Sequence, residues 1–303
     1  MRIFTLIAAM AMACEVGPGP DGGVGGATSA PPVASPAPAG GRAVAPALLD
    51  RYDFEERLRR FDLPGRLDEV SGLAFTPDGR LFAHDDERGR VHEIDPVTGE
   101  VGKRFDLGPG ELQDDFEGIA VVGERFFLIS STGRLYEFRE GADRENVEYR
   151  VTDAGLGGRC EVEGLDYDAD LDALLVACKV TIPESDDIVV HVVPMAPDVE
   201  RPPVVRARKA ELAAFGLPTA FDPSGITVTP VGTWMLVSGR HEAIVEIDRK
   251  GSVLAAVALR KGRHPQPEGI ALGDDGTLYI SDEKNGQEAR LTAYAPRAAE
   301  PAR

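Results

Sequence analysis

Val70-Ser71-Gly72-Leu73-Ala74 is the first copy of a five-residue phrase that the chain repeats four more times in altered form. Each copy has Ser or Glu, then glycine, then an aliphatic residue. The later copies are Phe116-Glu117-Gly118-Ile119-Ala120, Val162-Glu163-Gly164-Leu165-Asp166, Pro223-Ser224-Gly225-Ile226-Thr227 and Pro267-Glu268-Gly269-Ile270-Ala271. The glycines stand 46, 46, 61 and 44 residues apart. A period in the forties built of short strands predicts a radial array, because one such unit cannot bury its apolar face alone.

The pattern predicts an all-β, five-bladed β-propeller, with six blades as the alternative. Blade one shows the whole unit, in which Asp78-Gly79 gives a strong hairpin signal. Its four expected strands are Val70–Phe75, Leu81–His84, Arg90–Ile94 and Val101–Leu107. The other blades follow the same plan, with Val147–Val151 as the outer strand of blade two. Blade five has only three strands of its own, which end with Ala289–Tyr294.

A segment before blade one is expected to complete blade five. Arg60-Phe61-Asp62-Leu63 recurs 44 residues later as Arg104-Phe105-Asp106-Leu107, which ends the outer strand of blade one. An open fourth position in blade five would leave an unpaired edge. We therefore expect Glu55–Leu63 to pair antiparallel with Ala289–Tyr294. The alternative is an amphipathic helix on the rim, for which Glu55, Glu56, Arg59 and Arg60 give fair pairing.

The first 46 residues differ in composition from the rest. Residues 1–14 resemble an export signal, with one basic residue, an apolar stretch and then Ala11-Met12-Ala13-Cys14. This ending resembles a bacterial lipobox, which predicts lipidation of Cys14; an ordinary signal peptide is the alternative. Residues 15–46 are mostly Gly, Pro and Ala and predict a disordered tether. We expect the propeller at residues 47–296 and a polar tail at 297–303.

Composition limits the partners. The 303 residues carry a net charge of −18, with only 33 Lys and Arg, whereas nucleic-acid binding needs a basic surface. The sequence therefore predicts no nucleic-acid partner and favours cations, or cationic or neutral ligands. Membrane attachment is expected through a lipid anchor only, in the bacterial cell envelope. The chain is expected to be a monomer.

Two of the three cysteines are expected to form a disulfide. A turn centred near Asp168–Asp170 places Cys160 and Cys178 directly opposite each other on adjacent strands. Opposed positions lie about 4.5–5.5 Å apart, close enough to bridge. Export permits oxidation. The alternative is two buried thiols.

Acidic residues collect where the repeated phrase begins. In each blade the start of the first strand and the end of the second lie at one face, because the two are antiparallel. Strand starts there bring Glu69, Asp115, Glu117, Glu161, Glu163, Asp222 and Glu268 to one rim. Second-strand ends bring Asp85, Asp86, Glu87, Lys179, Arg240, His241, Asp282 and Glu283. Crowded like charges favour a bound divalent cation.

We expect Ca²⁺ at this channel mouth, held by Glu117, Glu163 and Glu268, because hard oxygen ligands suit Ca²⁺. The alternative is that Glu or Ser before glycine only bonds backbone amides at a tight strand entry. Lys179 and Arg240 are available to neutralise the acids. The run Asp166-x-Asp168-x-Asp170-x-Asp172 mimics an EF-hand start but lacks its glycine and final glutamate, so it is expected to be a solvated turn.

Five stretches together resemble the SdiA-regulated, or YjiK-like, β-propeller family. They are Glu69–Leu73, Asp85–Gly89, Asp115–Ile119, Cys160–Leu165 and Gln266–Ile270, and the resemblance runs from about residue 52 to 295. It implies a propeller fold and an exported or membrane-anchored protein of bacteria. The chain is more distantly similar to calcium-dependent propeller hydrolases, but it lacks the Asn ligands of those enzymes.

Two functions fit these observations. The first is a non-catalytic propeller that holds a small molecule or a protein over its acidic channel mouth. The second is a Ca²⁺-dependent hydrolase of an ester, lactone or phosphoester, in which the metal acts as a Lewis acid. The first is favoured, because no nucleophile or general base can be assigned from the sequence.

Overall fold

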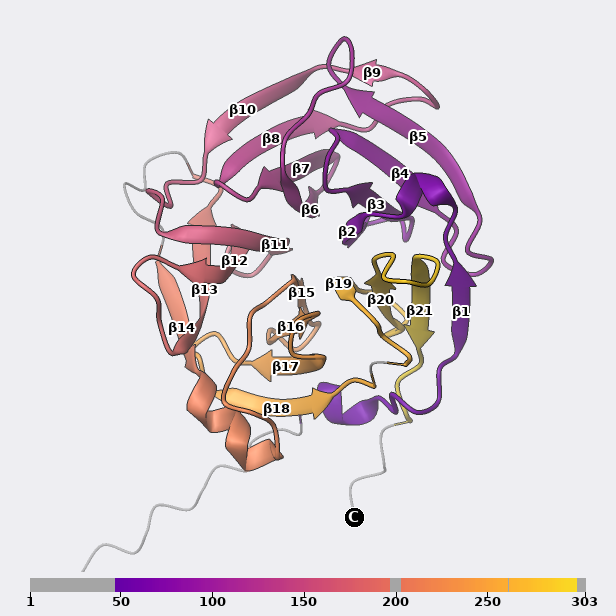
Figure 1. The fold of residues 1–303 in the computed structure, drawn as a ribbon. Coiled ribbons are helices and arrows are strands. Elements are labelled where there is room, and N and C mark those ends of the chain that lie inside the picture. The colour runs from indigo at the N-terminus through magenta and orange to yellow at the C-terminus, as the bar shows by residue number, and fades with distance from the viewer. Residues whose placement is uncertain (1–46, 197–202, 261, 299–303) are drawn as a thin grey trace, which may run out of the picture. The chain divides into compact units, whose positions relative to one another are not determined.

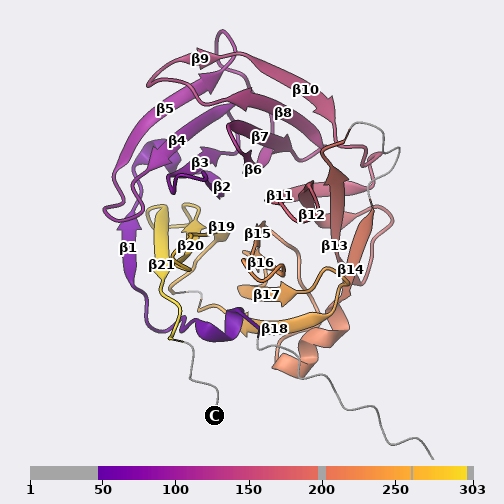
Figure 2. The same ribbon diagram turned by 180° about the vertical axis from the view of Figure 1, so that it is seen from behind.

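Twenty-one strands in five sheets surround a common axis in the computed structural model, which describes residues 47–196, 203–260 and 262–298 (Figures 1 and 2). The repeated phrase lies in the innermost strand of each sheet. The prediction of a five-bladed propeller is therefore confirmed, and the six-bladed alternative is excluded. The predicted signal sequence, Cys14 and the tether lie outside the described residues. Within the described ranges, no helix has both the length and the apolar character needed to cross a membrane.

The blades follow one another along the chain. Blade one contains β2 (Val70–Phe75), β3 (Leu81–Asp85), β4 (Arg90–Ile94) and β5 (Val101–Leu107). Blade two contains β6 (Phe116–Val122), β7 (Arg125–Ser130), β8 (Arg134–Arg139) and β10 (Tyr149–Asp153). Blade three contains β11 (Cys160–Asp168), β12 (Ala173–Thr181), β13 (Asp187–Pro194) and β14 (Val204–Arg208). Blade four contains β15 (Gly225–Val228), β16 (Trp234–Ser238), β17 (Ala243–Ile247) and β18 (Val253–Ala258).

Blade five is completed by the segment that precedes blade one. It contains β19 (Pro267–Leu272), β20 (Leu278–Asp282), β21 (Arg290–Tyr294) and, outermost, β1 (Arg59–Asp62). The register pairs Arg59 with Ala293 and Asp62 with Arg290 in antiparallel orientation. This confirms the predicted closure and excludes a helix at this position. The strand is shorter than expected, because the ladder begins only at Leu58, whose amide donates to the Ala293 carbonyl at 2.8 Å.

The predicted outer strand of blade two is divided between two blades. Asn146–Val147 forms β9, which adds a fifth, parallel strand to blade one beside β5. The chain then crosses to blade two as β10. Val147 is 9% exposed and packs in the cluster that contains Phe105, which draws this residue to blade one. Three short 3₁₀ helices complete the described elements: η1 (Leu49–Arg51), η2 (Gly65–Leu67) and η3 (Lys209–Phe215).

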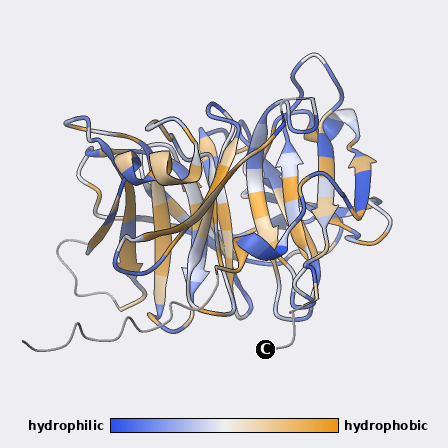
Figure 3. Cartoon of the chain, turned by 90° about the horizontal axis from the view of Figure 1, so that it is seen from below, coloured by the Kyte–Doolittle hydropathy of each residue, from blue (hydrophilic) through white to orange (hydrophobic). Residues whose placement is uncertain are grey.

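Apolar clusters fill the interfaces between neighbouring blades. The aromatic cluster of blades one and two, for example, contains Phe82, Phe105 and Phe126, with T-shaped ring contacts. Viewed from the side, apolar residues concentrate in the strands and polar residues are frequent in the loops (Figure 3). Each blade buries its faces against two neighbours, so closure of the ring covers apolar surface that an open end would expose.

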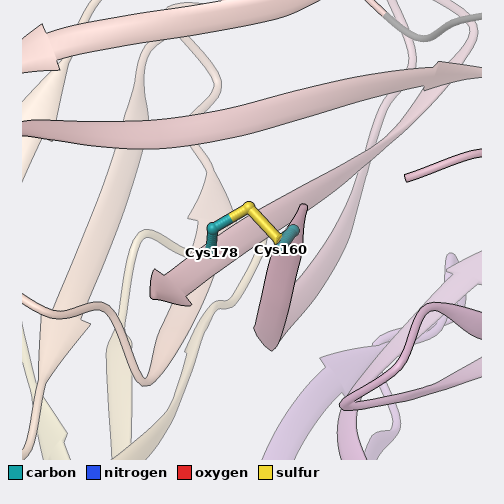
Figure 4. The surroundings of a disulfide bond; sticks show 2 residues. All are labelled: Cys160 and Cys178. Atoms are coloured by element: carbon teal, nitrogen blue, oxygen red, sulfur yellow. A yellow bond between two sulfur atoms is a disulfide. The ribbon is translucent and has the colours of Figure 1, made fainter. Parts of the chain in front are cut away.

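The disulfide between Cys160 and Cys178 is present, with 5.4 Å between the two Cα atoms (Figure 4). The prediction of the bond is confirmed, but the predicted direct opposition is wrong. The turn lies at residues 169–172, so the register places Cys160 opposite Thr181 and Val162 opposite Cys178. The bond therefore runs diagonally, at a position where a bulge shifts the register of β11 against β12.

The Asp-x-Asp run in the turn of blade three is only half solvated. Asp170 and Asp172 are exposed as expected, but Asp168 is fully buried. Its carboxylate accepts a bond from Trp234 Nε1 at 3.0 Å and two from Arg249, at 2.9 and 2.7 Å. Asp166 accepts a bond from the Val228 amide at 2.7 Å. The expectation of a solvated turn is thus wrong for Asp166 and Asp168, whose hydrogen bonds link blade three to blade four.

Candidate functional site at the channel mouth

In four of the five repeated phrases, a β-bulge re-aims one side chain. The pairing register shifts between Val70 and Gly72, and blades two, three and five shift at the same place in their own copies. A bulge leaves its extra residue unpaired and re-aims that side chain. The residue before each glycine is the one affected. These residues are Ser71, Glu117, Glu163 and Glu268, and Ser224 holds the same position in blade four, where strand pairing begins only at Gly225.

The glycines allow the five innermost strands to approach one another closely. A Cβ on Gly118 would lie 2.6 Å from the Leu165 amide nitrogen, and one on Gly225 would lie 2.4 Å from the Glu268 carbonyl oxygen. The cavity on the axis at this level measures about 10 Å³, which is room for about one water molecule. The expected central channel is therefore closed at the glycines, and the acidic mouth is a recess above them.

Three glutamates of the phrase influence one another in this recess. Burial, and then the charge of Glu163, raise the pKa of Glu117 to about 9. Burial and the charge of Glu163 also raise the pKa of Glu268 to about 8. Burial raises the pKa of Glu163 too, although Lys179 opposes this by donating a hydrogen bond to its Oε1. Glu117 and Glu268 are therefore largely protonated and neutral at pH 7.

A second group of acids lies between blades one, two and five. Burial, followed by a hydrogen bond with Glu69, raises the pKa of Glu283 to about 8. Burial and the charges of Glu69 and Glu87 raise the pKa of Asp86, and Asp115 adds to the effect. Asp115 also acts on Glu117 and Glu163, so the two groups form one acidic field. The structure thus brings these predicted rim residues together.

A pocket of about 330 Å³ opens off the axis between blades three, four and five. Glu163 and Lys179 line it from blade three, and Glu268 lines it from blade five. Its remaining walls are mostly polar. They include Asp222, Ser224, Arg240, Gln266 and Asn285. The pocket is large enough for a small molecule and is lined by both hydrogen-bond donors and acceptors.

On the blade-four side of the mouth, the carboxylate of Asp222 contacts three basic side chains. It bonds His241 Nε2 at 3.1 Å, Arg240 Nη1 at 3.3 Å and Lys209 Nζ at 3.4 Å. Partial burial raises its pKa, but the His241 hydrogen bond and the Lys209 charge outweigh this and lower it below the usual value. The negative charge on this side is therefore already compensated.

Asp282 is the exception among the predicted rim residues. Its side chain is fully buried and bonds His264 Nδ1 at 2.8 Å. The other ring nitrogen, His264 Nε2, lies 2.7 Å from the Tyr294 hydroxyl. Asp282 is therefore part of an internal network of blade five, in which its other carboxylate oxygen accepts a bond from the Gln266 backbone amide at 3.3 Å.

The predicted metal ligands do not converge on one point. Among the described residues, only Cys160, Cys178 and His191 offer three His, Cys, Asp or Glu ligand atoms within 4.8 Å of one another. Glu117, Glu163 and Glu268 would have to turn toward one another to share an ion. Their carboxylates have the hard oxygen donors that Ca²⁺ takes, but the geometry is not preassembled.

Sequence reasoning missed seven residues of the pocket, of which the polar ones are Ser224, Glu242, Gln266 and Asn285. A positional signal was available for Gln266. It stands three residues before Gly269, and the same position holds Glu69, Asp115, Glu161 and Asp222 in the other blades. Because glutamine carries no charge, a search for charged residues at this position does not find Gln266. Asn285 lies in a loop after β20 and carries no comparable signal.

The raised pKa values predict a loss of stability at high pH. A glutamate whose pKa rises from 4.5 to about 8 or 9 on folding stabilises the protein fully below its unfolded pKa, and this is lost as pH rises through the folded pKa. With chelator present, the double variant Glu117→Gln/Glu268→Gln should lose less stability than wild type between pH 6 and pH 9. The difference should be at least about 1.4 kcal/mol, equivalent to one pKa unit.

Urea denaturation at the two pH values measures this effect. Glu124→Gln is the matched control, because Glu124 is an exposed glutamate, with 83% of its side chain accessible. The control should follow wild type. A double variant that also follows wild type would show that the mouth acids are not held in their neutral form.

Five blades around a closed axis and an acidic recess at one face define the class of protein: a β-propeller with an acidic mouth. The chain belongs to the SdiA-regulated family, whose model matches residues 47–286.

Solved propellers resemble the fold at low identity. Glutaminyl cyclase of Myxococcus xanthus is 16% identical, with a TM-score of 0.58 over 81% of this chain and 97% of that one. Aldose sugar dehydrogenase of Streptomyces coelicolor, in its PQQ-bound form, is 15% identical, with a TM-score of 0.51 over 79% and 97%. At this identity the likeness extends to the fold alone.

Proposed function

We propose that this protein is an exported, lipid-anchored binding module that holds a small cationic ligand in its acidic mouth. Ca²⁺ is the simplest such ligand, and an organic amine has the same charge requirement. The observation that carries the proposal is the cluster of mostly buried carboxylates at the 330 Å³ pocket, which Glu163 and Glu268 line. Burial raises the pKa of both groups and of Glu117. Acids that repel each other when ionised bind a cation favourably, because its charge removes that repulsion.

The ion pairs already formed by the basic residues of the pocket favour a cationic ligand over an anionic one. Lys179 forms an ion pair with Glu163, and Arg240 forms one with Asp222. Burial lowers the pKa of Lys179, but the hydrogen bond and charge of Glu163 outweigh this and raise it, so the ammonium group stays charged. Glu268 forms no ion pair with the described residues and lines the pocket, so it is the group that an incoming cation would ionise.

The test is the melting temperature of the full chain with Ca²⁺ and with chelator. A ligand that binds only the folded state stabilises it by about 2.7 kcal/mol at a hundred times its Kd. Wild type should melt higher with Ca²⁺, and Glu163→Gln and Glu268→Gln should lose this gain. Glu124→Gln should keep it. Calcium that leaves wild type unchanged, or that stabilises the glutamine variants equally, would count against the metal.

A Ca²⁺-dependent hydrolase is the second candidate, favoured by one observation. The pKa of Glu268, about 8, lies near neutral pH, where a carboxyl group is most useful for general acid–base catalysis. The same purified protein should be tested on esters, lactones and phosphoesters with and without chelator. Turnover that disappears with chelator and in Glu268→Gln would favour the hydrolase over the binding module.

A further inference from the structure

Two cysteines and a histidine of blade three form a compact cluster that contains none of the mouth acids. Cys160 begins β11, Cys178 lies near the end of β12, and His191 lies on β13. All three are buried, with 5%, 2% and 6% of their surfaces exposed. Their ligand atoms lie within 4.8 Å of one another. Figure 4 shows the two sulfur atoms joined in the oxidised protein.

The histidine of this cluster is not explained by the fold. Its Nδ1 atom is buried and has no hydrogen-bond partner among the described residues. Buried polar atoms are nearly always satisfied, and His191 shares this exception with His84 and His92 among the described residues. An imidazole nitrogen that has no hydrogen-bond partner is available to bind a metal ion.

We propose that reduction of the Cys160–Cys178 disulfide converts this cluster into a site for a thiophilic metal ion, with Zn²⁺ as the ion that fits it. A dithiol reductant would supply two electrons and two protons, becoming a disulfide itself while Cys160 and Cys178 become thiols. Zn²⁺ would then displace the two thiol protons and bind both sulfurs and one imidazole nitrogen of His191.

The donor types agree with this ion, and after reduction the two sulfurs would have to move apart from their bonded positions to bind it together. Zinc binds sulfur at about 2.3 Å and imidazole nitrogen at about 2.0–2.1 Å, so its ligands lie less than about 4.6 Å from one another. Two soft sulfurs and one nitrogen favour zinc over calcium, which takes oxygen ligands. The three protein ligands leave a fourth position for water. β11 and β12 of blade three would thus be cross-linked by the disulfide in an oxidising compartment and by a zinc ion in a reducing one.

The experiment compares the full chain in its oxidised form and after reduction with a phosphine, in excess Ca²⁺ to occupy the mouth acids. Zinc binding is measured by competition with a chromophoric chelator, and Co²⁺ is used as a spectroscopic probe. The reduced protein should bind one equivalent of Zn²⁺ and show thiolate-to-cobalt charge-transfer absorption. The oxidised protein should do neither. His191→Gln should weaken zinc binding at least about tenfold.

His92→Gln is the matched control, because His92 is also buried, with both ring nitrogens unpartnered, but lies in blade one on β4. It should bind zinc like wild type. Equal zinc affinity of oxidised and reduced wild type would overturn the proposal without any variant. Reduced protein that loses the near-ultraviolet circular dichroism of Trp234 would overturn it too, because the site requires a folded blade.

Discussion

Deleting residues 47–63 should abolish cooperative folding of the propeller, whereas deleting residues 15–46 should leave its melting temperature unchanged. The first deletion removes β1, which pairs with β21 and closes the ring. It also removes Leu49, Tyr52, Phe54 and Leu63, which are all less than 9% exposed. Burying four such side chains contributes about 6–12 kcal/mol, which is comparable with the whole stability of a domain, about 5–15 kcal/mol.

Circular dichroism and thermal melts of the two truncated chains measure this difference. Two point variants provide the test if deletion of residues 47–63 gives no soluble protein. Leu63→Ala should cost about 2–5 kcal/mol, because Leu63 is 3% exposed, whereas Leu58→Ala should cost little, because Leu58 is 46% exposed. Equal melting temperatures of the two truncations, or of the two point variants, would contradict the closure by β1.

Replacing Asp168 with alanine should cost about 3 kcal/mol, the lower end of the range for breaking a buried ion pair, because the partner Arg249 is partly exposed. The variant leaves Trp234 Nε1 without its acceptor and Arg249 without its buried carboxylate. Asp170→Ala is the matched control. It removes an exposed carboxylate that bonds the same arginine at 2.9 Å, and it should cost less than about 1 kcal/mol.

Urea denaturation of the two variants separates the expected values. The midpoint for Asp168→Ala should fall clearly below that for Asp170→Ala, with no change in the slope. If the two variants unfold at the same urea concentration, then Asp168 does not fasten blade three to blade four, and the turn is solvated as the sequence suggested.

The repeated phrase was enough to predict the blades, because its glycine has one physical role in all five places. Only glycine permits the close approach of the innermost strands at the axis. The recurrence of Arg-Phe-Asp-Leu likewise predicted the closing strand, because each copy closes the fourth strand of a blade with a buried leucine: Leu107 ends β5, and Leu63 directly follows β1. Patterns of this kind repeat a local environment, so the sequence carries them.

Contacts between different blades were not predictable in the same way. The burial of Asp168 depends on Trp234 and Arg249, which lie 66 and 81 residues further along the chain. Asp282 is buried beside His264, which in turn contacts the Tyr294 hydroxyl, and no local pattern indicates this network. The rim acids were predicted as a set, but the distances between their carboxylates depend on side-chain rotation at the bulges, which the sequence does not encode locally.

Calcium titration by calorimetry, in two buffers with different ionisation enthalpies, tests the acidic mouth most directly. If Ca²⁺ ionises Glu117 and Glu268, whose pKa values are about 9 and 8, then binding must release protons at pH 7. The observed heat should therefore differ between the buffers, and the affinity should rise from pH 6 to pH 8. Binding at the same affinity throughout this range with no proton release, or no binding at millimolar Ca²⁺, would contradict a calcium-binding mouth.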